Sequence, residues 1–133
     1  MKVLFVCVHN SGRSQMAEAF ARELGAGAVE VESAGTVPGG RLNPVVVEAM
    51  AESGIDISGA TPKIIEQSMV DAADLVYTMG CAIDKACPAV FIPSEDWGLD
   101  DPAGQPIETV RVIRDQVEAR VHEMLQKVGA LEA

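Results

Sequence analysis

The sequence predicts an α/β protein of three layers, with a four-stranded parallel sheet between layers of helices. Apolar segments of strand length alternate along the chain with segments of helical periodicity. Residues 3–7 are apolar without interruption, which is typical of a central parallel strand buried on both faces. The 133 residues contain no repeat, linker or low-complexity stretch. We therefore expect one domain spanning residues 1–133.

The first half of the chain predicts two strands and two helices. After the strand 3–7, apolar residues at helical spacing predict a helix over 16–24. Residues 29–32 alternate apolar and charged, so this strand is expected at an edge of the sheet. Asn43 is a favourable N-cap and Pro44 a favourable first residue for a helix that runs to about residue 54.

The second half predicts two further strands and two further helices. Thr61 and Pro62 indicate a short helix through residue 65, and the apolar runs 75–78 and 89–92 indicate strands. A last helix is expected from Pro106. Its apolar stripe consists of Val110, Ile113, Val117, Val121, Met124 and Val128.

Composition excludes several classes of partner. A net charge of −10 disfavours nucleic acid and anionic membrane surfaces, since both require a basic surface. No apolar run reaches membrane-spanning length, and the N-terminus leads directly into a strand without an export signal. We therefore expect a cytoplasmic protein whose three cysteines are reduced thiols.

A cysteine and an arginine flank the loop between the first strand and the first helix. Such a loop directs its free N–H groups towards one point and binds an oxyanion, while the amides and Arg13 stabilise a nucleophilic thiolate at Cys7. Arg13 can hold two oxygens of the same anion. Ser14 can donate a hydrogen bond to the Cys7 sulfur, although a serine in the first turn of a helix is also common. The residues expected to contact the anion are Val8, His9, Asn10, Ser11, Gly12 and Arg13.

Two other segments are expected beside this loop, because ligands bind at the carboxyl ends of parallel strands. One follows the strand 75–78 and contains Cys81. The other follows the fourth strand and contains Asp100 and Asp101. Asp101, fixed by the proline after it, is the better candidate for a general acid that protonates an oxygen leaving group. The structural alternative is an Asx turn or a helix N-cap.

Cys81 and Cys87 are too far apart for a Cys-x-x-Cys redox motif and have too few neighbouring ligands for a closed zinc site. Two reduced cysteines without a role are the ordinary alternative. If Cys7 forms an adduct with a reducible oxyanion, however, a second thiol can attack that adduct and a third can resolve the disulfide.

Taken together, these motifs resemble the arsenate reductases built on the low-molecular-weight protein tyrosine phosphatase fold. The resemblance covers nearly the whole chain and includes the segments 7–18, 32–36, 80–88 and 96–104. It implies that Cys7 attacks arsenate, with Arg13 and the loop amides holding the oxyanion, and that Asp101 is the general acid. It further implies that Asn10 and Ser14 orient Cys7, that Cys81 releases arsenite, and that Cys87 then forms a disulfide with Cys81. Thioredoxin would reduce this disulfide. We expect a monomer without a cofactor.

The sequence departs from the family pattern at two places. Some members bind potassium through the equivalents of Asn10, Glu18, Ser33 and an aspartate, where this chain has Lys63. The lysine ammonium could replace the ion, so no metal site is expected. The gap between Cys81 and Cys87 is one residue shorter than in the best-known thioredoxin-coupled members. Glutaredoxin or mycothiol therefore stays open as the reductant.

The same motifs are compatible with two other functions. A tyrosine phosphatase would use Cys7 and Asp101 but not the two later cysteines. Such phosphatases usually carry aromatic residues after the Asp-Pro pair, where this chain has Ala103 and Gly104. A non-enzymatic phosphocysteine carrier or anion-sensing module would not need Arg13.

Overall fold

The computed structural model describes residues 1–7, 9–25, 27–35, 39–79, 95–100 and 102–129. Four parallel strands form one sheet: β1 (Lys2–Cys7), β2 (Glu30–Gly35), β3 (Leu75–Thr78) and β4 (Glu95–Asp96). Their order is β2-β1-β3-β4, which places the apolar β1 in the interior and the alternating β2 at an edge, as predicted.

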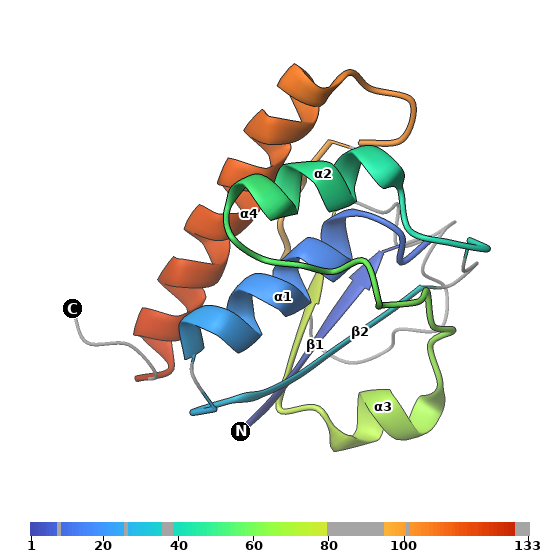
Figure 1. The fold of residues 1–133 in the computed structure, drawn as a ribbon. Coiled ribbons are helices and arrows are strands. Elements are labelled where there is room, and N and C mark those ends of the chain that lie inside the picture. Colours follow the sequence, from blue (N-terminus) through green and yellow to red (C-terminus); the bar gives the residue numbers. More distant parts are fainter. Residues whose placement is uncertain (8, 26, 36–38, 80–94, 101, 130–133) are drawn as a thin grey trace.

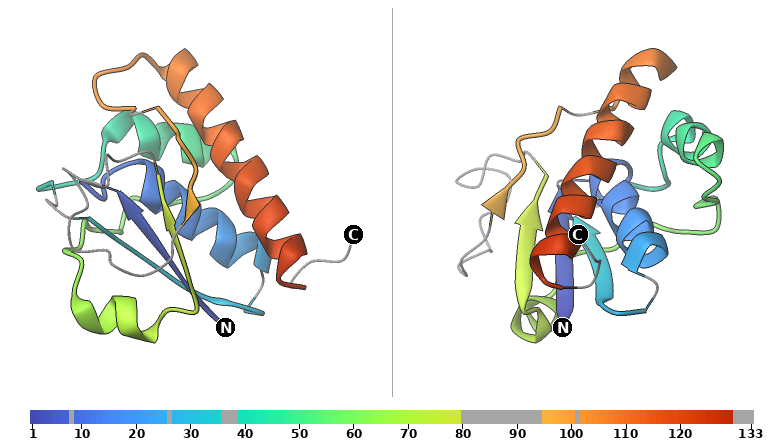
Figure 2. Two further views of the ribbon diagram at one scale, coloured as in Figure 1. Left: turned by 180° about the vertical axis from the view of Figure 1, so that it is seen from behind. Right: turned by 90° about the vertical axis from the view of Figure 1, so that its left-hand side faces the viewer.

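Helices cover both faces of the sheet (Figures 1 and 2). The helices α1 (Arg13–Gly25), α2 (Pro44–Glu52) and α4 (Ile107–Lys127) lie on one side, and α3 (Gln67–Ala72) lies on the other. Residues of β1 point alternately to these two sides because side chains of a strand alternate. Phe5 contributes to the larger core with α1, α2 and α4, whereas Val6 contributes to the smaller core with Val70 of α3. The predicted three-layer α/β architecture is confirmed.

Most predicted elements are present with small shifts at their ends. Helix α1 begins at Arg13, three residues earlier than expected, so the arginine lies in its first turn. Asn43 caps α2 as predicted, because its side chain accepts a hydrogen bond from the Val45 amide. Five of the six residues of the predicted apolar stripe on α4 are buried, and Val128 is half-buried. Among the described helices, none is both long and apolar enough to cross a membrane.

The helix predicted over residues 61–65 is wrong. Ile64 instead forms a parallel bridge with Gly35 at the end of β2, and the amide of Ile65 donates to the Gly35 carbonyl. Hydrogen bonding to the sheet therefore determines the conformation here, in place of the helix that Thr61 and Pro62 indicate. The helix in this region is α3, which starts at Gln67. The strand predicted over 89–92 lies outside the described residues.

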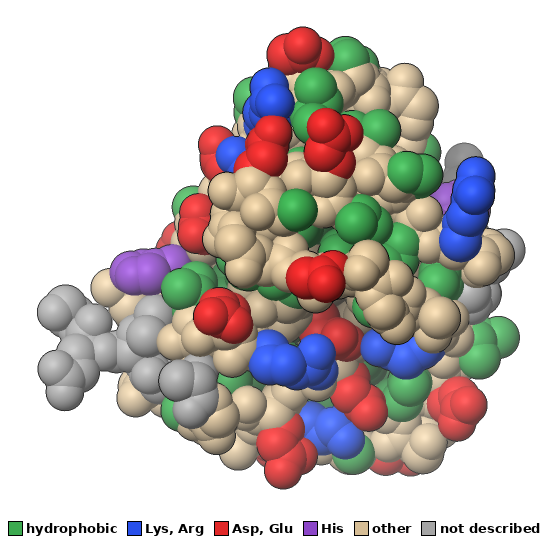
Figure 3. Space-filling model, in the orientation of Figure 1, with side chains coloured by type: hydrophobic (Ala, Val, Ile, Leu, Met, Phe, Trp, Pro, Cys, Tyr) green, Lys and Arg blue, Asp and Glu red, His purple; other side chains and the backbone are tan. Residues whose placement is uncertain are grey.

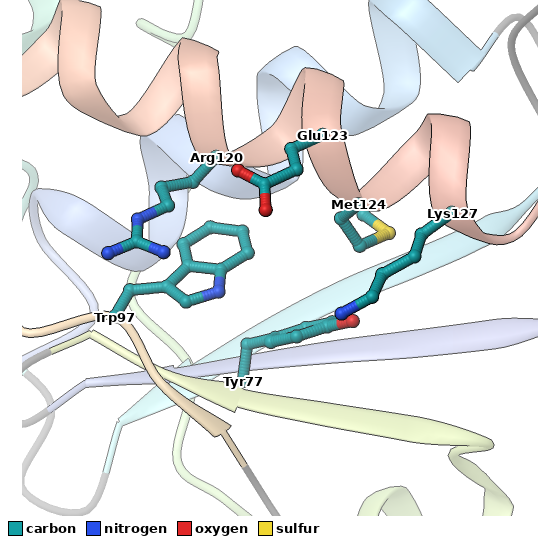
Figure 4. Close-up of a pocket in the computed structure, with 6 residues that line it drawn as sticks. All are labelled: Tyr77, Trp97, Arg120, Glu123, Met124 and Lys127. Atoms are coloured by element: carbon teal, nitrogen blue, oxygen red, sulfur yellow. The ribbon is translucent and has the colours of Figure 1, made fainter.

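An aromatic cluster fixes the segment that leaves β4. Trp97 packs on Tyr77 and Phe5 with ring centroids 4.9 Å and 5.6 Å apart, and its side chain is buried. Figure 4 shows Tyr77 and Trp97 between the sheet and α4, next to Met124. Burial of these large rings anchors the start of the loop that reaches the carboxyl edge of the sheet.

Candidate active site

Three segments that are distant in sequence meet at the carboxyl edge of the sheet. Arg13 joins them, because its Nη1 donates to the Met79 carbonyl after β3 at 2.7 Å and to the Leu99 carbonyl after β4 at 2.9 Å. Arg13 is itself in the first turn of α1, directly after the loop that follows β1. The expected convergence of the β1, β3 and β4 ends is thus present in the described residues.

The sulfur of Cys7 is buried and receives two polar contacts. The backbone amide of Asn10 donates to Sγ at 3.1 Å, and Oγ of Ser14 lies 2.8 Å from Sγ. Only 2% of Cys7 is exposed. A buried thiol with a backbone N–H and a hydroxyl directed at it can carry negative charge, since both groups can donate to a thiolate.

Asn10 shapes the loop around this sulfur. It is the only described non-glycine residue with a positive φ, 50°, a conformation that asparagine tolerates better than most residues. This backbone turn aims the Asn10 amide at Cys7. The side chain is fully buried, donates from Nδ2 to Ser14 Oγ at 2.7 Å, and accepts at Oδ1 from Gln15 Nε2 and from the Lys63 amide.

Arg13 combines rigidity with spare donor capacity. Two carbonyls hold Nη1, and the guanidinium carries further N–H groups on Nη2 and Nε. The side chain is 7% exposed and lines the same cavity as Cys7. A buried, anchored guanidinium next to a thiol and a helix N-terminus is suited to a small oxyanion.

The segment around Pro102 forms the opposite wall of this cavity. The ring of Pro102 approaches Gly12 so closely that a Cβ on Gly12 would lie 2.8 Å from the proline Cγ. Asn43 contacts both walls. Its backbone amide donates to the Ser11 carbonyl at 2.9 Å, and its side-chain Nδ2 lies 3.4 Å from the Pro102 carbonyl. A glycine is therefore needed at position 12 because the Pro102 ring leaves no room for a Cβ, and not because the backbone has a positive φ.

A buried acidic group supports the loop from behind. Glu18 accepts from Ser33 Oγ at 2.9 Å and lies 3.1 Å from Lys63 Nζ and 3.2 Å from Arg22 Nη1. The Lys63 ammonium and the Ser33 hydroxyl thus contact the same oxygen of Glu18. The Glu18 carboxylate is thus paired with two cations in the structure.

The structure brings together most of the predicted site. Cys7, His9, Ser11, Gly12 and Arg13 line one cavity, and Asn10 and Ser14 lie directly behind the sulfur. His9 is exposed at the rim. Four predicted residues lie outside the described part of the chain: Val8, Cys81, Cys87 and Asp101.

Several contributors were not recognised as site residues from the sequence. Asn43 was predicted only as a helix cap, yet it also lines the cavity together with Pro102 and Ala103. Gln15 is 2% exposed and bonds to Asn10. The available signal was a glutamine directly after Ser14 in the first turn of a helix. The sequence does not show that its side chain points towards Asn10, because this depends on the conformation of the loop.

The face of the molecule shown in Figure 3 carries mixed charge. On the face shown in Figure 3, Lys and Arg side chains stand among Asp and Glu side chains. With a net charge of −10, the long-range field does not attract anions. Local donors, namely the loop amides and Arg13, must therefore supply the affinity for an oxyanion.

Fold and site together define a class: α/β proteins in which a cysteine and an arginine enclose an anion-binding loop at the carboxyl edge of a parallel sheet. Comparison with known families agrees. A sequence profile of the low molecular weight phosphotyrosine protein phosphatase family matches residues 2–132. The chain belongs to this family.

Several similar proteins with more specific names are arsenate reductases. A glutaredoxin arsenate reductase of Synechocystis sp. is 44% identical over 132 residues, covering 96% of this chain and 98% of the relative. A solved arsenate reductase in the phosphate-binding state is 44% identical, with a TM-score of 0.85 and coverage of 95% and 97%. A thioredoxin-dependent arsenate reductase of Corynebacterium glutamicum is 35% identical with a TM-score of 0.79, covering 96% of this chain and 61% of that one.

Proposed function

We propose that this protein reduces arsenate to arsenite through a covalent adduct on Cys7. The observation that carries the proposal is the buried Cys7 sulfur, which has the Asn10 amide at 3.1 Å, Ser14 Oγ at 2.8 Å and the anchored Arg13 in the same cavity. The chain also contains two further cysteines, which a phosphatase reaction would not use. The names of the similar proteins support arsenate as the substrate.

In the first step the Cys7 thiolate attacks arsenic(V), and one oxygen leaves as water. The loop amides and the N–H groups on Nη2 and Nε of Arg13 hold the remaining oxygens. Asp101 protonates the departing oxygen. Its neighbour Pro102 packs on Gly12 of the oxyanion loop, which supports this assignment because the two segments must meet for proton transfer.

In the second step a thiolate of Cys81 attacks the Cys7 sulfur. The sulfur–arsenic bond breaks, its electron pair remains on arsenic, and arsenite leaves as Cys7 and Cys81 form a disulfide. Cys87 then attacks Cys81 and releases the Cys7 thiolate. Two thiols are thereby oxidised to one disulfide while arsenic(V) is reduced to arsenic(III).

A dithiol protein of the thioredoxin or glutaredoxin class returns the Cys81–Cys87 disulfide to the reduced state. The similar proteins support both, since one is named for glutaredoxin and another for thioredoxin. We place the reaction in the cytoplasm, because the relay must restart from reduced thiols.

The test compares arsenate-dependent oxidation of reduced thioredoxin, and of glutaredoxin with glutathione, with hydrolysis of p-nitrophenyl phosphate by the same preparation. We expect arsenate-dependent turnover with one of the two reductants and only weak phosphatase activity. Dominant phosphatase turnover without arsenate reduction would overturn the proposal in favour of a phosphatase. The family membership makes this the second candidate function.

A further inference from the structure

We propose that Gln15 is a positioning residue that, together with the backbone amide of Lys63, holds the direction of the hydrogen-bond chain ending at the Cys7 sulfur. This inference rests on the proposed nucleophilic role of Cys7. The chain runs from Gln15 Nε2 to Asn10 Oδ1 at 3.0 Å, from Asn10 Nδ2 to Ser14 Oγ at 2.7 Å, and from Ser14 to Cys7 at 2.8 Å. Gln15, Asn10 and Ser14 are each at most 2% exposed, so water does not compete for these bonds.

Backbone groups fix the direction at the far end of the chain. Gln15 lies 3.1 Å from the Thr61 carbonyl, which can only accept, so the amide nitrogen of Gln15 must face it. The same nitrogen reaches Asn10. The backbone amide of Lys63, which can only donate, also faces Asn10, at 2.8 Å. The Asn10 atom between these two donors is therefore its oxygen.

The direction then passes along the chain to the sulfur. Because Oδ1 of Asn10 is turned to Gln15 and Lys63, its NH₂ group is turned to Ser14 and donates to Oγ. The Ser14 oxygen accepts that bond, which leaves its single proton for the sulfur 2.8 Å away. The hydroxyl thus donates to Cys7 and stabilises the thiolate in preference to the thiol.

Other groups near the sulfur act independently of this chain. Arg13 and His9 line the cavity next to Cys7, and the Asn10 backbone amide donates directly to Sγ. The Lys63 ammonium pairs with Glu18, whereas the backbone amide of the same residue donates to the Asn10 side chain. Gln15 differs from the groups next to the sulfur because it acts on the sulfur only through the orientation of two other side chains.

Replacing Gln15 with glutamate puts an acceptor oxygen in the place of the donor Nε2. A carboxylate would face both the Thr61 carbonyl and the Asn10 oxygen, and the Asn10 amide relieves this repulsion by turning over, at the cost of the bond that its oxygen accepts from the Lys63 amide. Ser14 would then donate to Asn10 instead of Cys7. We expect Cys7 to react about tenfold more slowly on the acidic side of its pH profile, a change of the size that one hydrogen bond to a charged group contributes. Gln15→Met, which removes the donor without adding an acceptor, should give a smaller effect in the same direction.

The experiment measures iodoacetamide alkylation of Cys7 against pH in a Cys81→Ser, Cys87→Ser background, where Cys7 is the only thiol. Gln15→Glu should slow alkylation about tenfold on the acidic limb of the profile, where the rate rises with pH, and leave the rate in strong alkali within about twofold, because there every thiol is ionised. Gln126→Glu, an exposed change of the same charge on α4, should match the parent. Circular dichroism checks that each variant is folded.

A double-mutant cycle with Ser14→Ala makes the test specific. Without the Ser14 hydroxyl there is no proton left to direct, so Gln15→Glu should have no further effect on alkylation. Equal slowing at all pH values, or an undiminished effect in the Ser14→Ala background, would overturn the role of Gln15. If Gln15→Glu does not fold, the same criteria apply to Gln15→Met. The assay contains no arsenate, so its outcome is separate from the test of arsenate reduction.

Discussion

A methyl group added at Gly12 would collide with Pro102. The new Cβ would lie 2.8 Å from the proline Cγ, whereas ordinary contacts begin at 3.4 Å, so the ring must retreat by at least the difference, 0.6 Å. The proline ring is closed onto its own backbone and has no flexible end that could rotate away. The backbone of residue 102 must therefore move with the ring. Gly12 has no positive φ, so Gly12→Ala tests this approach without adding backbone strain.

The retreat should slow the first chemical step. If Asp101 is the acid, its carboxyl moves away from the leaving oxygen together with Pro102. Because a misplacement of about 1 Å can cost about 100-fold in rate, a retreat of this size should cost roughly 10-fold. The contact between Asn43 Nδ2 and the Pro102 carbonyl, 3.4 Å in the structure, should be lost as well.

The assay is rapid-quench measurement of the Cys7 adduct in a single turnover with arsenate. Gly39→Ala is the matched control, since a Cβ at that glycine would meet its nearest neighbours at 3.7 Å or more. A second arm combines Gly12→Ala with Asp101→Asn. The combined loss should be smaller than the product of the two losses, because both changes act on the same proton transfer. A wild-type single-turnover rate for Gly12→Ala would refute the idea that the approach of Pro102 positions the acid.

Three further predictions concern charged groups. Arg13→Lys should lower kcat/KM for arsenate about 100-fold, because an ammonium cannot hold two carbonyls and the oxyanion as a guanidinium does; an unchanged value would remove Arg13 from substrate binding. Asp101→Asn should slow the single-turnover rate by about 10²–10⁴ while sulfate affinity, measured calorimetrically, stays the same; an unchanged rate would shift the role to Asp100 or water. Hydrogen bonding to Arg111 lowers the pKa of Glu52 from 4.5 to about 2, so the stabilisation from this pair is complete above pH 4.5 and is lost as pH falls towards 2. Urea unfolding of wild type and Glu52→Gln should therefore differ at neutral pH and converge across that interval, and a constant difference would contradict the assignment.

Much of the fold followed from local patterns. The unbroken apolar run of β1, the alternation in β2 and the Asn43–Pro44 start of α2 each reflect a physical preference that acts within a few residues. The segment after Thr61 did not follow its local signal, because its backbone finds partners in Gly35 and in the Asn10 side chain. Helix α3 has no side-chain cap bond at Glu66, so its true start carried little signal.

The site was predictable where chemistry depends on the type of side chain. Cys7 and Arg13 could be proposed from the sequence because few types of residue can act as a nucleophile or hold an oxyanion at two points. The groups that anchor Arg13 are the carbonyls of Met79 and Leu99, and a backbone carbonyl has no sequence signature. The direction of the Gln15–Asn10–Ser14 chain likewise depends on the left-handed backbone of Asn10, which only the folded loop reveals.

The central claim is that three thiols act in sequence, and a single turnover of Cys87→Ser tests it most directly. The variant is mixed with excess arsenate without reductant, arsenite is counted per protein, and disulfides are mapped by mass spectrometry of its peptides. The account predicts one arsenite per protein and a Cys7–Cys81 disulfide, whereas Cys81→Ser treated in the same way should release no arsenite and contain no disulfide. Arsenite release by Cys81→Ser without added thiol, or none by Cys87→Ser, would contradict the relay.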